Sequence, residues 1–178
     1  MTAVTATDLL GGEALVVATA DEMHALGVQL GRLLRAGDLL LLTGDLAAGK
    51  TTLAQGIGDG LGVRGPVTSP TFVIARVHPN LGTGPALVHV DAYRLGSLAE
   101  LDDLDLDADL AEVVTVVEWG HGMAEALSED RLEIVLARLD EGVPAAGGNG
   151  EQDGIPTDRD QPRAVRAMGH GARWTEVG

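Results

Sequence analysis

The residues whose types and spacing predict chemistry most directly lie at positions 44–51, which read GDLAAGKT and match the pattern G-x-x-x-x-G-K-[ST]. Glycines let backbone N–H groups turn toward phosphate oxygens, and the following helix directs its positive dipole end at the same anion. Lys50 supplies an ammonium group for the β- and γ-phosphates, and Thr51 supplies a hydroxyl for the Mg²⁺ that bridges them. We therefore expect a nucleotide-binding P-loop here, rather than a glycine-rich turn with a solvated lysine.

Lys50 is the only lysine among the 12 cationic side chains of the chain. An ammonium group differs from a guanidinium in being a compact point charge, which suits the phosphate position of a P-loop. The 27 acidic residues outnumber the cations and give a formal net charge of −15. Proteins that bind DNA or RNA on their own need a cationic surface to release counterions, so the composition argues against that function.

Two apolar runs end in a carboxylate. Residues 87–90 precede Asp91, and residues 113–117 precede Glu118. In open α/β sheets, ligands bind outside the carboxyl ends of the strands, so both carboxylates are expected at the edge that carries the P-loop. Oxygen ligands for Mg²⁺ and a group that orients water are what a nucleotide-hydrolysing site requires, although strand ends also carry solvated acids.

Three further residues have two interpretations each. His89 shares a strand face with Asp91, and a structural role is favoured for it because lone strand histidines are usually structural. Thr71, in Ser69-Pro70-Thr71, is either a γ-phosphate sensor or part of a rigid turn. Trp119 either walls the site beside Glu118 or packs in the core.

Composition and missing motifs exclude several classes. The absence of cysteine excludes disulfides and thiolate chemistry, and no apolar run is long enough to span a membrane, so we expect a cytoplasmic protein without a membrane partner. An N-K-x-D motif is impossible because the only lysine is in the P-loop, and L-S-G-G-Q is absent. A compact ATPase, a small-molecule kinase of the P-loop class and a nucleotide-gated binding module with negligible turnover remain as alternatives.

Hydrophobic periodicity and breakers predict strands that alternate with helices. Thr19 and Glu22 form a capping box that starts a helix ending near Gly37, and a second helix is expected from about Lys50 to Leu61. Strands are expected at 39–42, 71–78, 86–91, 113–117, 132–139 and 163–168, and further helical segments at 97–112 and 123–127.

This order predicts an α/β fold of the P-loop NTPase type, with three layers (α/β/α), a mostly parallel central sheet and antiparallel additions near the C-terminus. Residues 1–12 are expected to be a loose leader, and residues 13–178 a single domain. Within that domain, residues 140–162 are rich in glycine, proline and acids and are expected to form a flexible acidic loop.

Four segments taken together resemble one protein family: residues 44–52 (GDLAAGKTT), 69–72 (SPTF), 89–94 (HVDAYR) and 117–119 (VEW). In this order and spacing they resemble the TsaE (or YjeE) family of bacterial ATPases, over roughly residues 17–139. The resemblance implies a part in making N6-threonylcarbamoyladenosine at position 37 of tRNA. It also implies ATP and Mg²⁺ as cofactors, and as partners a TsaD-type transferase with its TsaB-type paralogue, which ATP hydrolysis resets. Contact with tRNA is then only indirect, through the complex.

The P-loop pattern and the resemblance together assign roles to named residues. Nucleotide-binding residues are expected to be Gly44, Asp45, Leu46, Ala47, Ala48, Gly49, Lys50, Thr51, Thr52 and, by the resemblance, Arg163. Catalytic residues are expected to be Lys50, Asp91, Glu118 and Thr71, and metal ligands Thr51, Glu118 and Asp91. By analogy, residues 19–21 are expected beside the adenine.

Ala47 departs from the family pattern, which has glycine at this position of the loop. Alanine fits the general P-loop pattern as long as the backbone at this position does not need a positive φ. If it does, we expect a lower affinity for phosphate.

Overall fold

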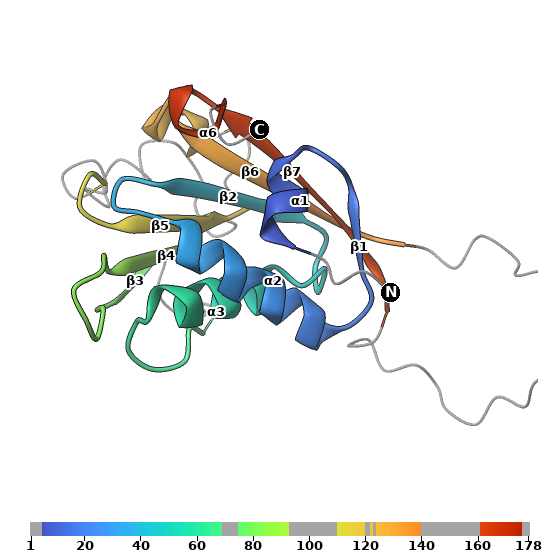
Figure 1. Cartoon of the computed structure of the whole chain (residues 1–178), viewed down its shortest axis with the longest axis horizontal. Coiled ribbons are helices and arrows are strands. Elements are labelled where there is room, and N and C mark those ends of the chain that lie inside the picture. The colour runs from blue at the N-terminus through green and yellow to red at the C-terminus, as the bar shows by residue number, and fades with distance from the viewer. Residues whose placement is uncertain are drawn as a thin grey trace, which may run out of the picture.

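The computed structural model describes residues 5–68, 75–92, 110–119, 122, 124–139 and 161–175, which contain a seven-stranded sheet with helices across one face (Figure 1). The first half contains α1 (Ala6–Leu10), β1 (Leu15–Val17), α2 (Ala20–Leu33), β2 (Leu39–Gly44) and α3 (Lys50–Leu61). The second half contains β3 (Ala75–His78), β4 (Leu87–Asp91), β5 (Val114–Glu118), the 3₁₀ helix η2 (Ala124–Leu127), β6 (Arg131–Arg138), β7 (Arg163–His170) and α6 (Ala172–Thr175). The expected α/β class is confirmed.

The strand order is β1-β7-β6-β2-β5-β4-β3. The four central strands, β6, β2, β5 and β4, are parallel, whereas β7, β1 and β3 pair antiparallel at the two sides. The four leucines of β2 are fully buried, as the unbroken apolar run predicts for a strand covered on both faces. The mostly parallel sheet and the antiparallel return of the last strand are therefore as predicted.

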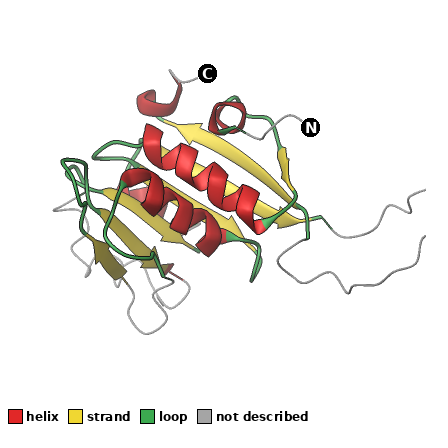
Figure 2. Ribbon diagram, turned by 60° about the horizontal axis from the view of Figure 1, so that its bottom comes forward, coloured by secondary structure: helices red, strands yellow, loops and turns green. Residues whose placement is uncertain are grey.

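Glycines bring α2 and α3 into backbone contact on one face of the sheet (Figure 2). A Cβ atom added at Gly56 of α3 would lie 2.2 Å from the carbonyl oxygen of His24, and one added at Gly60 would lie 2.3 Å from that of Val28. Gly27 of α2 meets α3 in the same way, 2.4 Å from the Leu53 carbonyl oxygen. Because α3 starts at Lys50, this contact fixes the helix that follows the P-loop.

Thr19 caps α2 as the sequence predicts, but the Glu22 carboxylate binds the N–H of the residue before the cap instead of that of Thr19. The Thr19 side chain accepts the Glu22 N–H, and the Glu22 carboxylate accepts the Ala18 N–H at 2.7 Å. The end of the helix differs from the prediction. Leu34 already has an extended backbone, and Gly37 (φ +93°) instead shapes the turn into β2, where its N–H donates to the Val113 carbonyl.

The N-terminal segment is not a loose leader over its described part, and that prediction is wrong. Thr5 caps α1, the Ala6 N–H donates to the Gln29 side chain at 3.0 Å, and Ala6 and Leu9 are buried in the main core. The reason is that a five-residue helix is too short to show a helical period, yet it can bury two side chains against α2.

The C-terminal segment adds an element that the sequence did not predict. Helix α6 packs its Trp174 into the core, and Arg173 forms a bidentate ion pair with buried Asp38, with N–O distances of 3.0 and 3.1 Å. Asp38 directly precedes β2, so this pair ties the end of the chain to the start of the central strand.

The second face of the sheet carries a smaller apolar cluster around Leu39, Leu41 and Val90, with Leu127 of η2 against it. Most of the expected helical segment 97–112, residues 71–74 of the expected strand and residues 140–160 of the expected acidic loop lie outside the described residues. None of the helices that the structure describes is both long and apolar enough to cross a bilayer.

We expect the Gly56→Ala substitution to lower the free energy of unfolding by about 2 kcal/mol, because the added methyl group forces two helix backbones apart. The higher helix propensity of alanine offsets only part of this cost, at about 1 kcal/mol. Denaturant unfolding checks the change. Gly82→Ala is the control, since its Cβ makes only an ordinary 3.5 Å contact with Asn80. A Gly56→Ala protein as stable as the control would contradict the backbone contact.

Candidate nucleotide-binding site

The P-loop connects β2 to α3 at the carboxyl end of the central strand. β2 ends at Gly44, where a Cβ atom would lie 2.3 Å from the Leu136 carbonyl oxygen of β6, so only glycine fits. Gly49 (φ +102°) occupies the N-cap position of α3, and the Ala48 N–H donates to the Asp45 carbonyl at 3.1 Å. Strand, loop and helix therefore follow one another as the motif predicts.

The ammonium group of Lys50 lies inside its own loop. Its Nζ donates to the carbonyl oxygens of Gly44 and Asp45, both at 2.7 Å, and lies 3.9 Å from the ring centroid of Trp119. The residue is only 5% exposed, and loss of hydration lowers the pKa of Lys50, against the opposing effect of Glu118, Asp45 and Asp91. This cation is thus stabilised by neighbours rather than by water.

The two strand-end carboxylates lie next to each other. Asp91 and Glu118 are register partners on the parallel strands β4 and β5, and both are buried. Thr51 Oγ1 at the start of α3 lies 3.4 Å from Glu118 Oε1. The structure therefore brings together Lys50, Thr51, Asp91 and Glu118, which are residues from three separate segments of the sequence.

His89 lies against Glu118, whereas the sequence favoured a purely structural role for it. Its Nε2 lies 2.9 Å from Glu118 Oε1, and its side chain is fully buried. Its Nδ1 has no hydrogen-bond partner in the part of the chain that the structure describes. A ring that donates from Nε2 suits this arrangement and holds the carboxylate that faces Thr51.

Trp119 belongs to the site and not to the core. Its ring lies over Lys50, its backbone N–H donates to the Leu42 carbonyl at 3.1 Å, and its backbone φ is +62°. A left-handed backbone is rare for a bulky residue and costs roughly 1–3 kcal/mol, so the surrounding sheet must impose it. The residue with this backbone is the one whose ring contacts the P-loop lysine.

Ala47 has a φ of +60°, so the condition under which alanine was expected to be tolerated does not hold. A side chain in the left-handed region costs about 1–2 kcal/mol relative to glycine. Two arginines contact this part of the loop: Arg163 Nη2 donates to the Ala47 carbonyl at 3.2 Å, and Arg138 Nη2 donates to the Leu46 carbonyl at 3.3 Å. The sequence pointed to Arg163 but missed Arg138, whose only signal is its position at the end of a strand.

The start of α2 also lies beside the loop. β1 ends at Val17, which pairs with Arg163, and Met23 Cε lies 3.4 Å from where a Cβ of Gly49 would be. The capped residues 19–21 are therefore near the P-loop edge of the sheet. Thr52 is half-buried within the first turn of α3. Thr71, Tyr93 and Arg94 lie outside the described residues.

The donor set fits Mg²⁺ bound to a nucleotide. Magnesium uses one or two protein carboxylates and takes its other ligands from phosphates and water, and a closed all-protein cage is not needed. Asp91, Glu118 and the Thr51 hydroxyl offer such a set. The described residues hold no group of three or more acids, histidines or cysteines that could bind a metal ion by themselves.

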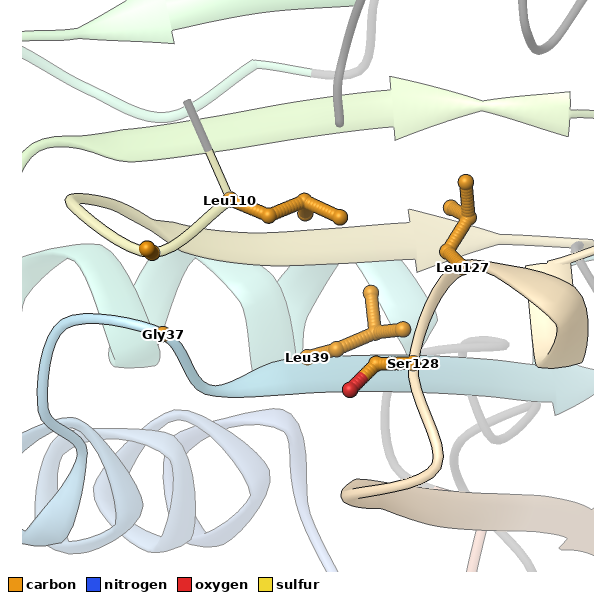
Figure 3. Close-up of a pocket in the computed structure, with 6 residues that line it drawn as sticks. Gly37, Leu39, Leu110, Leu127 and Ser128 are labelled. Carbon is orange, nitrogen blue, oxygen red and sulfur yellow. The ribbon is translucent and has the colours of Figure 1, made fainter. Parts of the chain in front are cut away.

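A separate hollow of about 520 Å³ lies at the other end of the strands (Figure 3). It is lined by Gly37, Leu39, Leu110, Ala111, Leu127 and Ser128. These residues precede or begin β2, β5 and β6, whereas the P-loop follows β2. The lining contains no titratable side chain, so this hollow is not the predicted site.

A parallel α/β sheet with a P-loop between its central strand and the next helix defines the P-loop NTPase-like class. The sequence model of the family described as "Threonylcarbamoyl adenosine biosynthesis protein TsaE" matches residues 17–143. The chain therefore belongs to the TsaE family, whose members take part in the biosynthesis of threonylcarbamoyladenosine in tRNA.

Individual relatives agree with this assignment. The chain is 56% identical over 153 residues to the tRNA threonylcarbamoyladenosine biosynthesis protein TsaE of Streptomyces coelicolor, covering 85% of this chain and 93% of that protein. The TsaE protein of Bacillus subtilis is 41% identical over 119 residues, covering 66% of this chain and 73% of that protein. The crystal structure of YdiB from Bacillus subtilis matches with a TM-score of 0.64 and 28% identity, covering 93% of this chain and 90% of that one.

We expect Ala47→Gly to tighten the binding of an ATP analogue by about threefold, because glycine removes the cost of the left-handed backbone and raises the fraction of loops in the binding-competent shape. Titration calorimetry measures the change. Ala48→Gly is the control, since the φ of Ala48 is not positive and its buried methyl group fills space. Equal or weaker binding by Ala47→Gly contradicts the strain argument.

The stability of the protein should also depend on the protonation of Lys50. The pKa of Lys50 is lowered in the folded state, so the unfolded chain binds more protons between that value and 10.5. The free energy of unfolding should therefore rise with pH in this window, relative to a Lys50→Met variant. Urea unfolding between pH 7 and 10.5 tests this cleanly, because the chain has no other lysine, no cysteine and one tyrosine. Parallel curves for the two proteins would show that Lys50 titrates normally.

Proposed function

We propose that the chain is a Mg²⁺-dependent ATPase that serves as an accessory subunit in the formation of threonylcarbamoyladenosine on tRNA. The observation that carries the proposal is the convergence of Lys50, Thr51, Asp91 and Glu118 at the carboxyl end of the central strands. Phosphoryl transfer to water needs little covalent chemistry from a protein, so positioning and electrostatic stabilisation account for most of the catalysis.

Each residue has a role that follows from its surroundings. Lys50 exchanges the carbonyl oxygens of Gly44 and Asp45 for the β- and γ-phosphate oxygens of ATP, which bind an ammonium group more strongly because they are charged. The loop amides and the start of α3 bind the remaining phosphate charge. Lys50 is already desolvated before ATP binds, which increases its electrostatic effect on the transferred group.

Magnesium, when bound, would neutralise charge on the phosphates and is expected to be held by the Thr51 hydroxyl, Glu118 and Asp91. His89 keeps the Glu118 carboxylate turned toward Thr51 through its 2.9 Å contact. Asp91, which pairs with Glu118 on the adjacent strand, orients a metal-bound water or accepts its proton. Thr71, as a γ-phosphate sensor, completes the proposed set.

The proposed partner is a heterodimer of a TsaD-type transferase and a TsaB-type paralogue. ATP hydrolysis would reset this complex between turnovers, and tRNA would be bound through the complex. The net charge of −15 supports docking on a basic partner surface, and it argues against direct capture of tRNA.

We expect Lys50→Ala to lower heterodimer-stimulated ATP hydrolysis by at least about 100-fold, the size of effect typical for the loss of one transition-state charge contact. Phosphate release is measured with and without the purified TsaB–TsaD-type heterodimer. Arg166→Gln is the charge control, since it removes one exposed cation of β7. Circular dichroism confirms that both variants fold.

Three outcomes would redirect the assignment. Undiminished hydrolysis by Lys50→Ala contradicts the site. Transfer of phosphate to a small-molecule acceptor, instead of release as free phosphate, supports the kinase alternative, and tight ATP binding without turnover supports the nucleotide-gated binding module.

A further inference from the structure

Two arginines face each other where β6 and β7 meet the P-loop. Arg138 and Arg163 are direct register partners at one end of this antiparallel pair. Like charges at directly opposed positions destabilise a sheet, and Arg163 is only 7% exposed, which adds the cost of dehydration. Contacts made by the guanidinium groups must offset these costs, and the P-loop supplies two such contacts.

Both guanidinium groups donate to consecutive carbonyl groups of the P-loop. Arg138 Nη2 reaches the Leu46 carbonyl at 3.3 Å, and Arg163 Nη2 reaches the Ala47 carbonyl at 3.2 Å. This part of the loop has little other packing, since residues 45–47 are exposed and Leu46 is 81% exposed. The arginines therefore restrain a segment that its own side chains do not restrain.

The two carbonyl groups belong to the two peptide planes on either side of the Ala47 Cα atom. The relative orientation of these planes is the φ and ψ of Ala47, so fixing both carbonyls fixes the conformation of this residue. Ala47 is also the loop residue with the left-handed φ of +60°. The two arginine contacts therefore act on the loop residue whose left-handed backbone an alanine side chain disfavours.

The same contacts decide where the amide groups of the loop point. In a trans peptide the N–H is directed opposite to the carbonyl, so a carbonyl turned toward an arginine leaves the next N–H turned away from it. The Ala48 N–H accordingly donates to the Asp45 carbonyl within the loop. Amides turned inward are what a phosphate-binding loop requires.

We propose that Arg138 and Arg163 are positioning residues that form a clasp on the P-loop, hold Ala47 in its left-handed conformation and so keep the loop in the shape that binds phosphate. Arg163 acts on the nucleotide through the loop, not by direct contact. The clasp uses β7, which lies beyond residues 17–143 matched by the family model. The proposal rests on the proposed binding of ATP by the P-loop.

A double-mutant cycle tests the clasp. Binding of a non-hydrolysable ATP analogue with Mg²⁺ is measured by calorimetry for wild type, Arg163→Gln, Ala47→Gly and the double variant. We expect Arg163→Gln to weaken binding about tenfold when residue 47 is alanine, and no more than about twofold when it is glycine, because glycine adopts the left-handed backbone without help. Arg138→Gln, at a less buried site, should show the same pattern and covers the case in which Arg163→Gln fails to fold.

The matched control is Arg166→Gln. Arg166 is exposed and lies on the same strand, and the alternation of side chains along β7 places it on the opposite sheet face from Arg163. Binding by this variant should stay within about twofold of wild type in either background. An equal loss for Arg163→Gln in the alanine and glycine backgrounds would overturn the clasp, because it would show a direct contact with the nucleotide.

A second readout does not involve nucleotide. Amide hydrogen exchange at Ala48, followed by NMR in the free protein, should speed up at least tenfold in Arg163→Gln and stay unchanged in Arg166→Gln. Faster exchange together with absent ATP binding by the wild type would overturn the proposed function and leave the clasp standing. Unchanged exchange in Arg163→Gln and Arg138→Gln would overturn the clasp, whatever the affinity for ATP.

Discussion

A single buried ammonium group sets the constraints on this structure. Lys50 is 5% exposed, and removing its charge from water is costly unless other groups replace the hydration. Two loop carbonyls, an aromatic face and three nearby carboxylates replace it here. These groups come from β2, β4, β5 and the P-loop, so the charge is stabilised only when these three strands are assembled. ATP, as proposed, would take over the role of the carbonyls.

Rigidity around this charge comes from two sides. On one side, α3 packs backbone to backbone on α2 through glycines, so the first turn of α3 has little freedom to move. On the other side, Arg138 and Arg163 contact the outer carbonyls of the loop from the antiparallel strands β6 and β7. The loop between these supports is short and exposed, and it contains a left-handed alanine. The two arginines, which lie outside the P-loop motif, thus offset the conformational cost of a left-handed alanine within it.

Much of the fold was predictable because its signals are local. The apolar runs that form β2, β4, β5 and β6, the Thr19 helix cap and the helix after the P-loop all follow from short-range patterns. The short elements α1, β1 and α6 were missed because three to five residues do not show a period. The end of α2 was misplaced because Gly37, which resembles a helix terminator, instead serves the turn into β2.

The sequence by itself determined the P-loop, the order of the longer strands and helices, and the two carboxylates at strand ends, since spacing and hydrophobic pattern carry that information. Only the tertiary structure decided that His89 holds Glu118, that Trp119 covers Lys50, that Ala47 is left-handed and that two arginines meet at the loop. Each of these contacts depends on the register between strands far apart in the chain. A shift of one residue turns a side chain to the other face of the sheet, and that register is set by packing of the complete core.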